Sequence, residues 1–191
     1  MPQSDAIKRS PAQQAALNRF LGEVERRAFR MAEIATRNPD EALDVVQDAI
    51  LVLVRNYGDR SEADWRPLFH RILQSRINDW YRRRAVRAKV LVVRQWFGGG
   101  DGDELPDPID TAPAPRGEPG EEVDNQRSGA AIIAALKTLP RRQQQAFMLR
   151  AWEGLDVAAT AHAMGCSEGS VKTHYFRATR ALQRQLEVFR P

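Results

Sequence analysis

A stretch near the middle of the chain divides the sequence into two parts that must fold separately. Residues 98–125, GGGDGDELPDPIDTAPAPRGEPGEEVDN, are rich in glycine, proline and acid and contain almost no large apolar side chain. Such a segment cannot bury enough apolar surface to offset the entropy lost on ordering, so it is typical of a flexible linker. We therefore expect the 191-residue chain to form two small domains, at 13–97 and 126–188.

Charge is distributed over the same three blocks. Residues 1–97 contain 18 lysines and arginines against 12 acids, residues 98–125 contain one against nine, and residues 126–191 contain ten against four. Solvated surface charge with no further role would be mixed more evenly. Two basic domains separated by an acidic segment therefore indicate contacts with phosphate groups.

Composition excludes several classes of protein. No apolar run approaches the length of a membrane span, and the N-terminus lacks the apolar core of a signal peptide. The single cysteine, Cys166, cannot form an internal disulfide and suits a reducing cytoplasm. His70, His162 and His174 are scattered, so we expect no metal site and no cofactor.

Helical periodicity covers the N-terminal block. Apolar residues recur at the spacing of one helical face from about Gln13 to Arg37. Asn38 and Pro39 then have the chemistry of an N-cap and a first helical residue, with Glu41 completing a capping box, and predict a second helix to about residue 56. After a break at 57–59, a long third helix capped by Ser61 or Asp64 should reach about residue 94.

The C-terminal block predicts four more helices, at about 126–138, 141–152, 155–164 and 168–187. Leu139-Pro140, Gly154 and the turn Gly165-Cys166-Ser167 separate them, and Ser167 is the expected N-cap of the last. No strand-like alternation of apolar and polar residues is present. The predicted fold class is therefore all-α.

The last two of these helices predict a helix-turn-helix. The final helix divides into an apolar stripe and a basic face, and the small residues of the preceding helix would allow the close crossing that this motif needs. Side chains near the N-terminus of the second helix of such a motif contact base edges and phosphates. The candidate DNA-binding residues are Glu168, Ser170, Lys172, Thr173, His174 and Arg177.

A second candidate site lies on the long third helix. From residue 66 to 94 there are nine lysines and arginines and one acid, interleaved with aromatic residues. Cations and flat rings together are typical of single-stranded DNA binding, because rings stack on unpaired bases while cations follow the phosphates. Core packing is the favoured interpretation for Phe69 and Ile72, and nucleic-acid contact is favoured for Tyr81 and the run Arg82-Arg83-Arg84.

A third candidate site is an acidic stripe on the second helix. Asp44, Gln47 and Asp48 share one face at i, i+3 and i+4. Amid otherwise apolar residues, this stripe suggests a protein-binding face, although solvated acids are the more usual explanation.

Together, these segments resemble the extracytoplasmic-function (ECF) class of bacterial RNA polymerase sigma factors, within the sigma-70 family. Residues 42–48, ALDVVQD, are similar to the acidic signature through which that family binds core polymerase. Residues 66–84, RPLFHRILQSRINDWYRRR, are similar to its helix that melts and reads the -10 promoter element. Leu139-Pro140 and the helices after it, with the recognition pattern GSVKT at 169–173, are similar to its -35-reading domain.

The resemblance implies a role for each site. Core polymerase would bind Asp44, Gln47 and Asp48, and the helix-turn-helix would read the -35 element. The -10 element would be held by the following residues: Arg76, Asp79, Trp80, Tyr81, Arg82, Arg83 and Arg84. Residues 13–97 would then be a sigma-2-like domain and residues 126–188 a sigma-4-like domain. An anti-sigma factor is a further candidate partner, and no catalytic residue is expected because the chemistry stays with polymerase.

Two alternatives remain open at this stage. A stand-alone helix-turn-helix regulator with an N-terminal sensing or dimerisation domain explains residues 154–185 equally well, but not the arginine-rich aromatic helix or the acidic linker. A metal-dependent nuclease is disfavoured, because Asp44 and Asp48 form a poor metal pair without further ligands.

Overall fold

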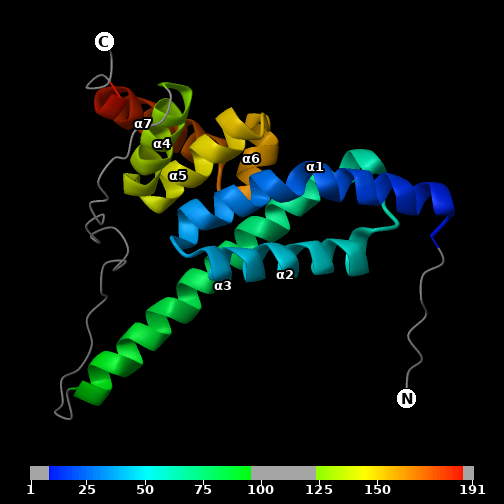
Figure 1. Cartoon of the computed structure of the whole chain (residues 1–191), viewed down its shortest axis with the longest axis horizontal. Helices are drawn as coiled ribbons and strands as arrows, with labels where there is room; N and C mark the ends of the chain where they lie inside the picture. Colours follow the sequence, from blue (N-terminus) through cyan, green and yellow to red (C-terminus); the bar gives the residue numbers. More distant parts are fainter. Residues whose placement is uncertain (1–8, 96–123, 187–191) are drawn as a thin grey trace. The chain divides into compact units, whose positions relative to one another are not determined.

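The described residues fold into helices (Figure 1). The structure is a computed structural model, and it describes residues 9–95 and 124–186. In chain order the elements are α1 (Pro11–Thr36), α2 (Pro39–Tyr57), α3 (Glu62–Gln95), α4 (Asp124–Thr138), α5 (Arg141–Phe147), the π-helix η1 (Met148–Trp152), α6 (Val157–Met164) and α7 (Glu168–Leu186). This confirms the predicted all-α class.

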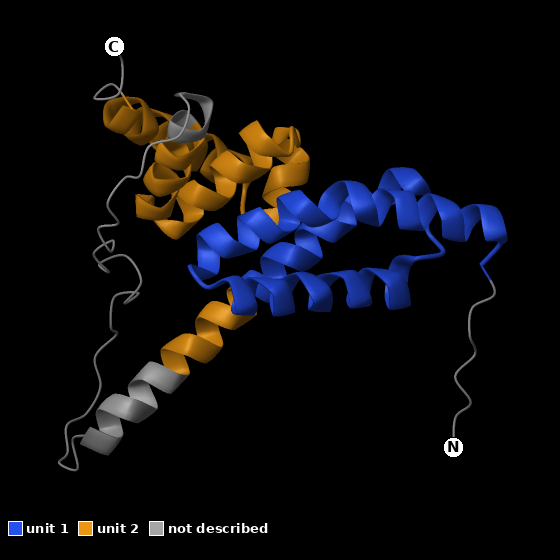
Figure 2. Cartoon of the chain, in the orientation of Figure 1, with its two compact units in different colours: residues 1–77 blue, residues 78–191 orange. Residues whose placement is uncertain are grey.

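The chain divides into two compact units, residues 1–77 and 78–191 (Figure 2). The boundary between them falls inside α3. The predicted domain limits at 97 and 126 stay predictions, because residues 96–123, which include most of the predicted linker, lie outside the described part of the chain.

Helix α1 begins and ends where local chemistry requires it to. The Ser10 hydroxyl accepts a hydrogen bond from the backbone N–H of Gln13, and Pro11 occupies the first helical position. At the other end Arg37 takes a left-handed conformation, with φ of 57°, and its N–H donates to the carbonyl of Glu33. This residue ends α1 and turns the chain directly into the cap of α2.

The predicted start of α2 is confirmed. The Asn38 side chain accepts from the N–H groups of Asp40 and Glu41, at 2.9 and 3.1 Å, and Pro39 is the first helical residue. Helices α1 and α2 lie side by side (Figure 1). Each presents an apolar stripe to the core of the first unit. The buried stripe of α2 is Ala42, Val45, Val46, Ala49 and Leu53.

Helix α3 completes the core of the first unit. Its residues at i, i+4, i+8 and i+12, namely Trp65, Phe69, Leu73 and Ile77, are all buried. The Phe20 ring of α1 lies 5.8 Å from that of Trp65 and 6.2 Å from that of Phe69. The core interpretation of Phe69 is thus confirmed, whereas Ile72 is only half-buried.

In the second unit the predicted helix at 141–152 is interrupted. Its first part is α5, and its second part, η1, widens into π-helical geometry. Met148 and Leu149 are nevertheless buried, so the wider turn still points apolar side chains into the core. The buried Gln144 is satisfied because its side-chain amide donates to the carbonyl of Leu136, at 2.9 Å.

Candidate nucleic-acid interface

Three residues with distinct chemistry set the two ends of α6 and the start of α7. Asp156 caps α6 by accepting from the N–H of Ala159 at 2.7 Å. Gly165 ends α6 with φ of +64°, a left-handed conformation that a residue with a Cβ adopts only under strain. The Ser167 hydroxyl then accepts from the N–H of Ser170 at 3.2 Å, which confirms the predicted cap of α7.

Small buried residues hold α6 and α7 together. Ala161 and Ala163 of α6 are buried, and so are Val171, Ala178 and Leu182 of α7. Since alanine side chains are short, the two helices can approach closely and hold a fixed crossing. Tyr175 and Leu186 are half-buried at the edges of this stripe.

The predicted DNA-binding residues gather on the outer side of α7. Glu168, Lys172, Thr173 and Arg177 are exposed, while Ser170 and His174 are half-buried. Thr173 donates its hydroxyl hydrogen to the carbonyl of Gly169 at 3.0 Å, which leaves its methyl group and the oxygen lone pairs to an incoming partner. The structure therefore brings all six residues together over the first half of one helix.

His174 lies where positive charge accumulates. Burial lowers its pKa below the ordinary value of 6.5, and the guanidinium groups of Arg142 and Arg177 lower the pKa further. Arg142 is held in place because it donates to the carbonyl of Met164, at 2.7 Å, at the end of α6. Both effects favour the uncharged form of the imidazole in the free protein.

Sequence reasoning missed an aromatic residue on the same face. Phe176 is 60% exposed, although it follows the half-buried Tyr175. The guanidinium of Arg180 lies over its ring, 5.3 Å from the centroid. Position 176 is three residues after Thr173 and lies off the stripe formed by Val171, Ala178 and Leu182, so its place on the helical wheel could have revealed it.

On α3 the arginine run and the aromatic residues separate. Arg82, Arg83 and Arg84 are exposed, whereas Trp80 and Tyr81 are 3% and 7% exposed. The two rings form an edge-to-face pair with centroids 4.9 Å apart, and the Arg84 guanidinium lies 5.3 Å from the Trp80 ring. The cations are thus open to solvent and the rings are not.

The other two residues predicted to meet the -10 element flank that pair. Arg76 and Asp79 are half-buried, and the Asp79 carboxylate accepts a hydrogen bond from Arg82. This ion pair lowers the net positive charge that the segment presents to a nucleic acid. Arg82, Arg83 and Arg84 all stay exposed, but the ion pair with Asp79 partly neutralises the charge of Arg82.

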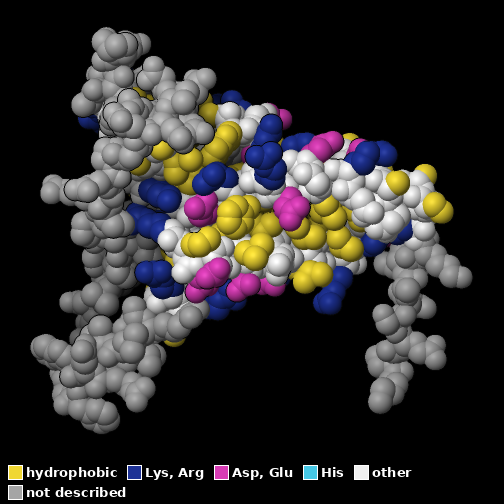
Figure 3. Space-filling view, in the orientation of Figure 1, with side chains coloured by type: hydrophobic (Ala, Val, Ile, Leu, Met, Phe, Trp, Pro, Cys, Tyr) yellow, Lys and Arg dark blue, Asp and Glu magenta, His cyan; other side chains and the backbone are white. Residues whose placement is uncertain are grey.

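The acidic stripe on α2 is exposed along its whole length. Asp44, Gln47 and Asp48 all face solvent, and acidic side chains gather along the part of the surface that α2 occupies (Figure 3). Leu43 and Leu51, 45% and 50% exposed, frame these residues at the same helical spacing. The sequence pattern did not predict that these two leucines belong to this face. Exposed leucines beside acids are typical of a protein-binding face.

Comparison with known proteins identifies a matching family model and several similar relatives. A family model described as "Sigma-70, region 4" matches residues 129–182, which contain the helix-turn-helix. The RNA polymerase sigma-E factor of Streptomyces avermitilis is 28% identical over 159 residues, covering 83% of this chain and 78% of the relative. The ECF RNA polymerase sigma factor BldN of Streptomyces coelicolor is 43% identical over 68 residues, covering 36% of this chain and 26% of the relative.

The chain belongs to the ECF sigma factors of the sigma-70 family. A solved structure, the sigma factor RpoE of Bartonella quintana, shares the fold with a TM-score of 0.60 at 23% identity, over 90% of this chain and 99% of that one. Sigma factors are not enzymes, so no residue of this sigma factor is assigned a catalytic role. Along the described residues, no helix is long and apolar enough to cross a membrane.

Proposed function

We propose that this sigma factor docks on core RNA polymerase through α2 and reads promoter DNA through α7 and α3. The observation that carries the proposal is the first half of α7, where the helix-turn-helix holds cations and hydroxyls outside the buried stripe of a capped helix. A helix presented in this way fits the major groove of DNA.

The -35 element is the proposed target of α7. Lys172 and Arg177 are exposed and can donate to guanine or phosphate, and Thr173 can contact a base edge or a thymine methyl group. In its uncharged form, His174 can accept one hydrogen bond and donate another. Phe176 adds an apolar contact for a thymine methyl group.

The -10 element is the proposed target of the second half of α3. Its exposed arginines can follow the phosphates of the melted strand. Stacking on unpaired bases through Trp80 or Tyr81 requires these rings to become uncovered, because both are buried in the chain on its own. We propose that assembly with polymerase and DNA uncovers them.

Core polymerase is the proposed partner of the α2 face. Asp44, Gln47 and Asp48 supply charge and hydrogen-bonding groups, and Leu43 and Leu51 supply apolar area on both sides of them. The polar groups at the centre of such a face fix the orientation of the partner, and the apolar neighbours add affinity. This arrangement favours a cytoplasmic holoenzyme subunit over a stand-alone regulator, since a regulator has no need of such a face.

An anti-sigma factor is a further proposed partner. The similar sigma factor RpoE of Bartonella quintana was solved in complex with the anti-sigma factor NepR. Because the fold is shared along 90% of this chain, we propose that a protein of that kind restrains this sigma factor as well.

Co-purification with core polymerase tests the docking face. Asp44→Arg reverses the charge at the centre of the α2 face and should abolish co-purification. Glu25→Arg, an exposed acid on α1, is the matched control and should leave it intact. Retained binding by the Asp44 variant would contradict the assignment of α2 as the docking face for core polymerase. In vitro transcription with core polymerase, with mapped start sites, then tests promoter recognition itself.

A further inference from the structure

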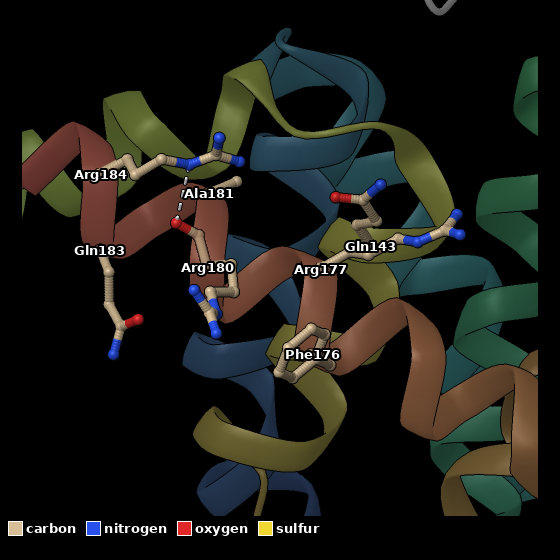
Figure 4. Close-up of a pocket in the computed structure, with 7 residues that line it drawn as sticks. All are labelled: Gln143, Phe176, Arg177, Arg180, Ala181, Gln183 and Arg184. Carbon is tan, nitrogen blue, oxygen red and sulfur yellow. Dashed lines mark hydrogen bonds between the residues drawn. The ribbon is translucent and has the colours of Figure 1, made fainter.

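A hollow lies between α5 and the second half of α7, and it begins at Phe176 and Arg177, which are assigned above to the -35 element. It has a volume of about 570 Å³ and is lined by Gln143 of α5 and by six residues of α7: Phe176, Arg177, Arg180, Ala181, Gln183 and Arg184 (Figure 4). None of these lining residues is acidic, and three of them are arginines. The hollow therefore selects for negative charge.

Two of the arginines are held in position by their neighbours. Arg180 lies over the Phe176 ring, 5.3 Å from its centroid, and Arg184 donates from its Nε to the carbonyl of Arg180 at 3.3 Å. Figure 4 shows both side chains and this hydrogen bond. A guanidinium that is oriented before binding loses less conformational entropy when an anion arrives.

The position of these arginines along α7 indicates what the anion is. Thr173, Arg177, Arg180 and Arg184 follow one another on one face, at spacings of three and four residues. At 1.5 Å per residue, Arg180 and Arg184 lie about 10–17 Å beyond Thr173 along the helix axis. The major groove is about 12 Å wide. A helix that inserts its N-terminal half there carries its second half out past the groove wall, along which the phosphate backbone runs.

We propose that the hollow between α5 and α7 is a phosphodiester site that binds the DNA backbone beside the -35 element through Arg180 and Arg184. This inference rests on the proposed entry of α7 into the major groove. The site adds affinity without reading sequence, because phosphates are the same at every base pair. An acidic protein surface is the competing occupant, and it would not respond to the charge of DNA.

Salt dependence of promoter binding tests the site. Holoenzyme reconstituted from core polymerase and the full chain is titrated with a duplex carrying the mapped promoter, at increasing potassium chloride concentration. Each phosphate contact contributes about 0.9 to the slope of log K against log salt. Arg180→Ala/Arg184→Ala should therefore lower the magnitude of the slope by about 1.8 and weaken binding by roughly tenfold or more.

Three controls make the result specific. Arg180→Lys/Arg184→Lys should keep the slope, since lysine also binds phosphate. Arg26→Ala removes an exposed charge from α1 and should change nothing. The alanine double variant should keep the wild-type preference for an intact over a scrambled -35 element. An unchanged slope in that variant overturns the phosphodiester site, and lost transcription with an unchanged slope assigns the hollow to an acidic protein.

The same experiment separates this inference from the proposed function. If scrambling the -35 element has no effect on wild-type holoenzyme, α7 does not read that element and the proposed function fails. If scrambling matters but the alanine double variant keeps its full slope, only the phosphodiester site fails.

Discussion

Helices α3 and α7 carry the same kinds of residue and present them differently. Each combines aromatic rings with a series of arginines. On α7 the Phe176 ring is 60% exposed and lies among the cations, whereas on α3 the Phe69, Trp80 and Tyr81 rings are 0%, 3% and 7% exposed. A ring among arginines thus belongs to the binding face in one helix and to the interior in the other. The difference arises from what packs against each helix.

The largest expected effect contrasts the two phenylalanines. Phe69→Ala opens a cavity in the core of the first unit and should lower the free energy of unfolding by about 3–5 kcal/mol. Phe176→Ala removes an exposed ring and should change the free energy of unfolding by less than about 0.5 kcal/mol. Urea unfolding followed by circular dichroism measures both. Equal losses of unfolding free energy in the two variants would contradict this prediction.

The next effect contrasts the cations of the two helices. Arg177→Ala should cost about 1–3 kcal/mol of discrimination between intact and altered -35 elements, if this arginine contacts a base edge. Arg83→Ala should weaken the open complex without altering -35 preference, because its proposed contacts are with phosphates of the melted strand. Competition binding of both holoenzymes to promoter variants measures the contrast. Core binding should be unchanged in both, and the exposed Arg26 provides the control substitution.

A smaller effect concerns the side chains at the N-termini of α6 and α3. Asp156→Ala removes the side chain that caps α6 and should lower the free energy of unfolding of the second unit by about 1 kcal/mol. Asp64, near the start of α3, accepts a hydrogen bond from the Ser61 hydroxyl at 2.7 Å. Since that bond joins two exposed side chains, Asp64→Ala should cost less. Thermal unfolding of the two variants tests the order, and a larger loss for Asp64→Ala would contradict it.

The smallest effect is the pH dependence contributed by His174. Its pKa is lowered in the folded chain, so the unfolded chain takes up this proton at higher pH than the folded chain does. The contribution to stability is therefore present above the ordinary histidine pKa and is lost as pH falls below it. His174→Gln should flatten the fall in urea midpoint between pH 7.5 and 5.5. His162→Gln, an exposed residue of α6, is the control, and an identical fall in wild type and His174→Gln would contradict the prediction.

Element boundaries were predictable because their causes are local. The caps at Asn38 and Ser167 and the left-handed turn at Gly165 depend on residues two to four positions away, which the sequence displays directly. The π-helical geometry of η1 was not predicted. Nothing in the spacing of residues 141–152 distinguishes it from a regular helix.

Sequence alone determined the all-helical class, the helix-turn-helix and the positions of the charged faces on α2 and α7. These follow from the helical period, because residues three and four apart must share a face. Only the tertiary structure decided that Phe176 is exposed while Trp80 and Tyr81 are buried, and that Gln143 lines a hollow with Arg180 and Arg184. The physical reason is that exposure and hollows depend on contacts between residues far apart in the chain, which no local pattern records.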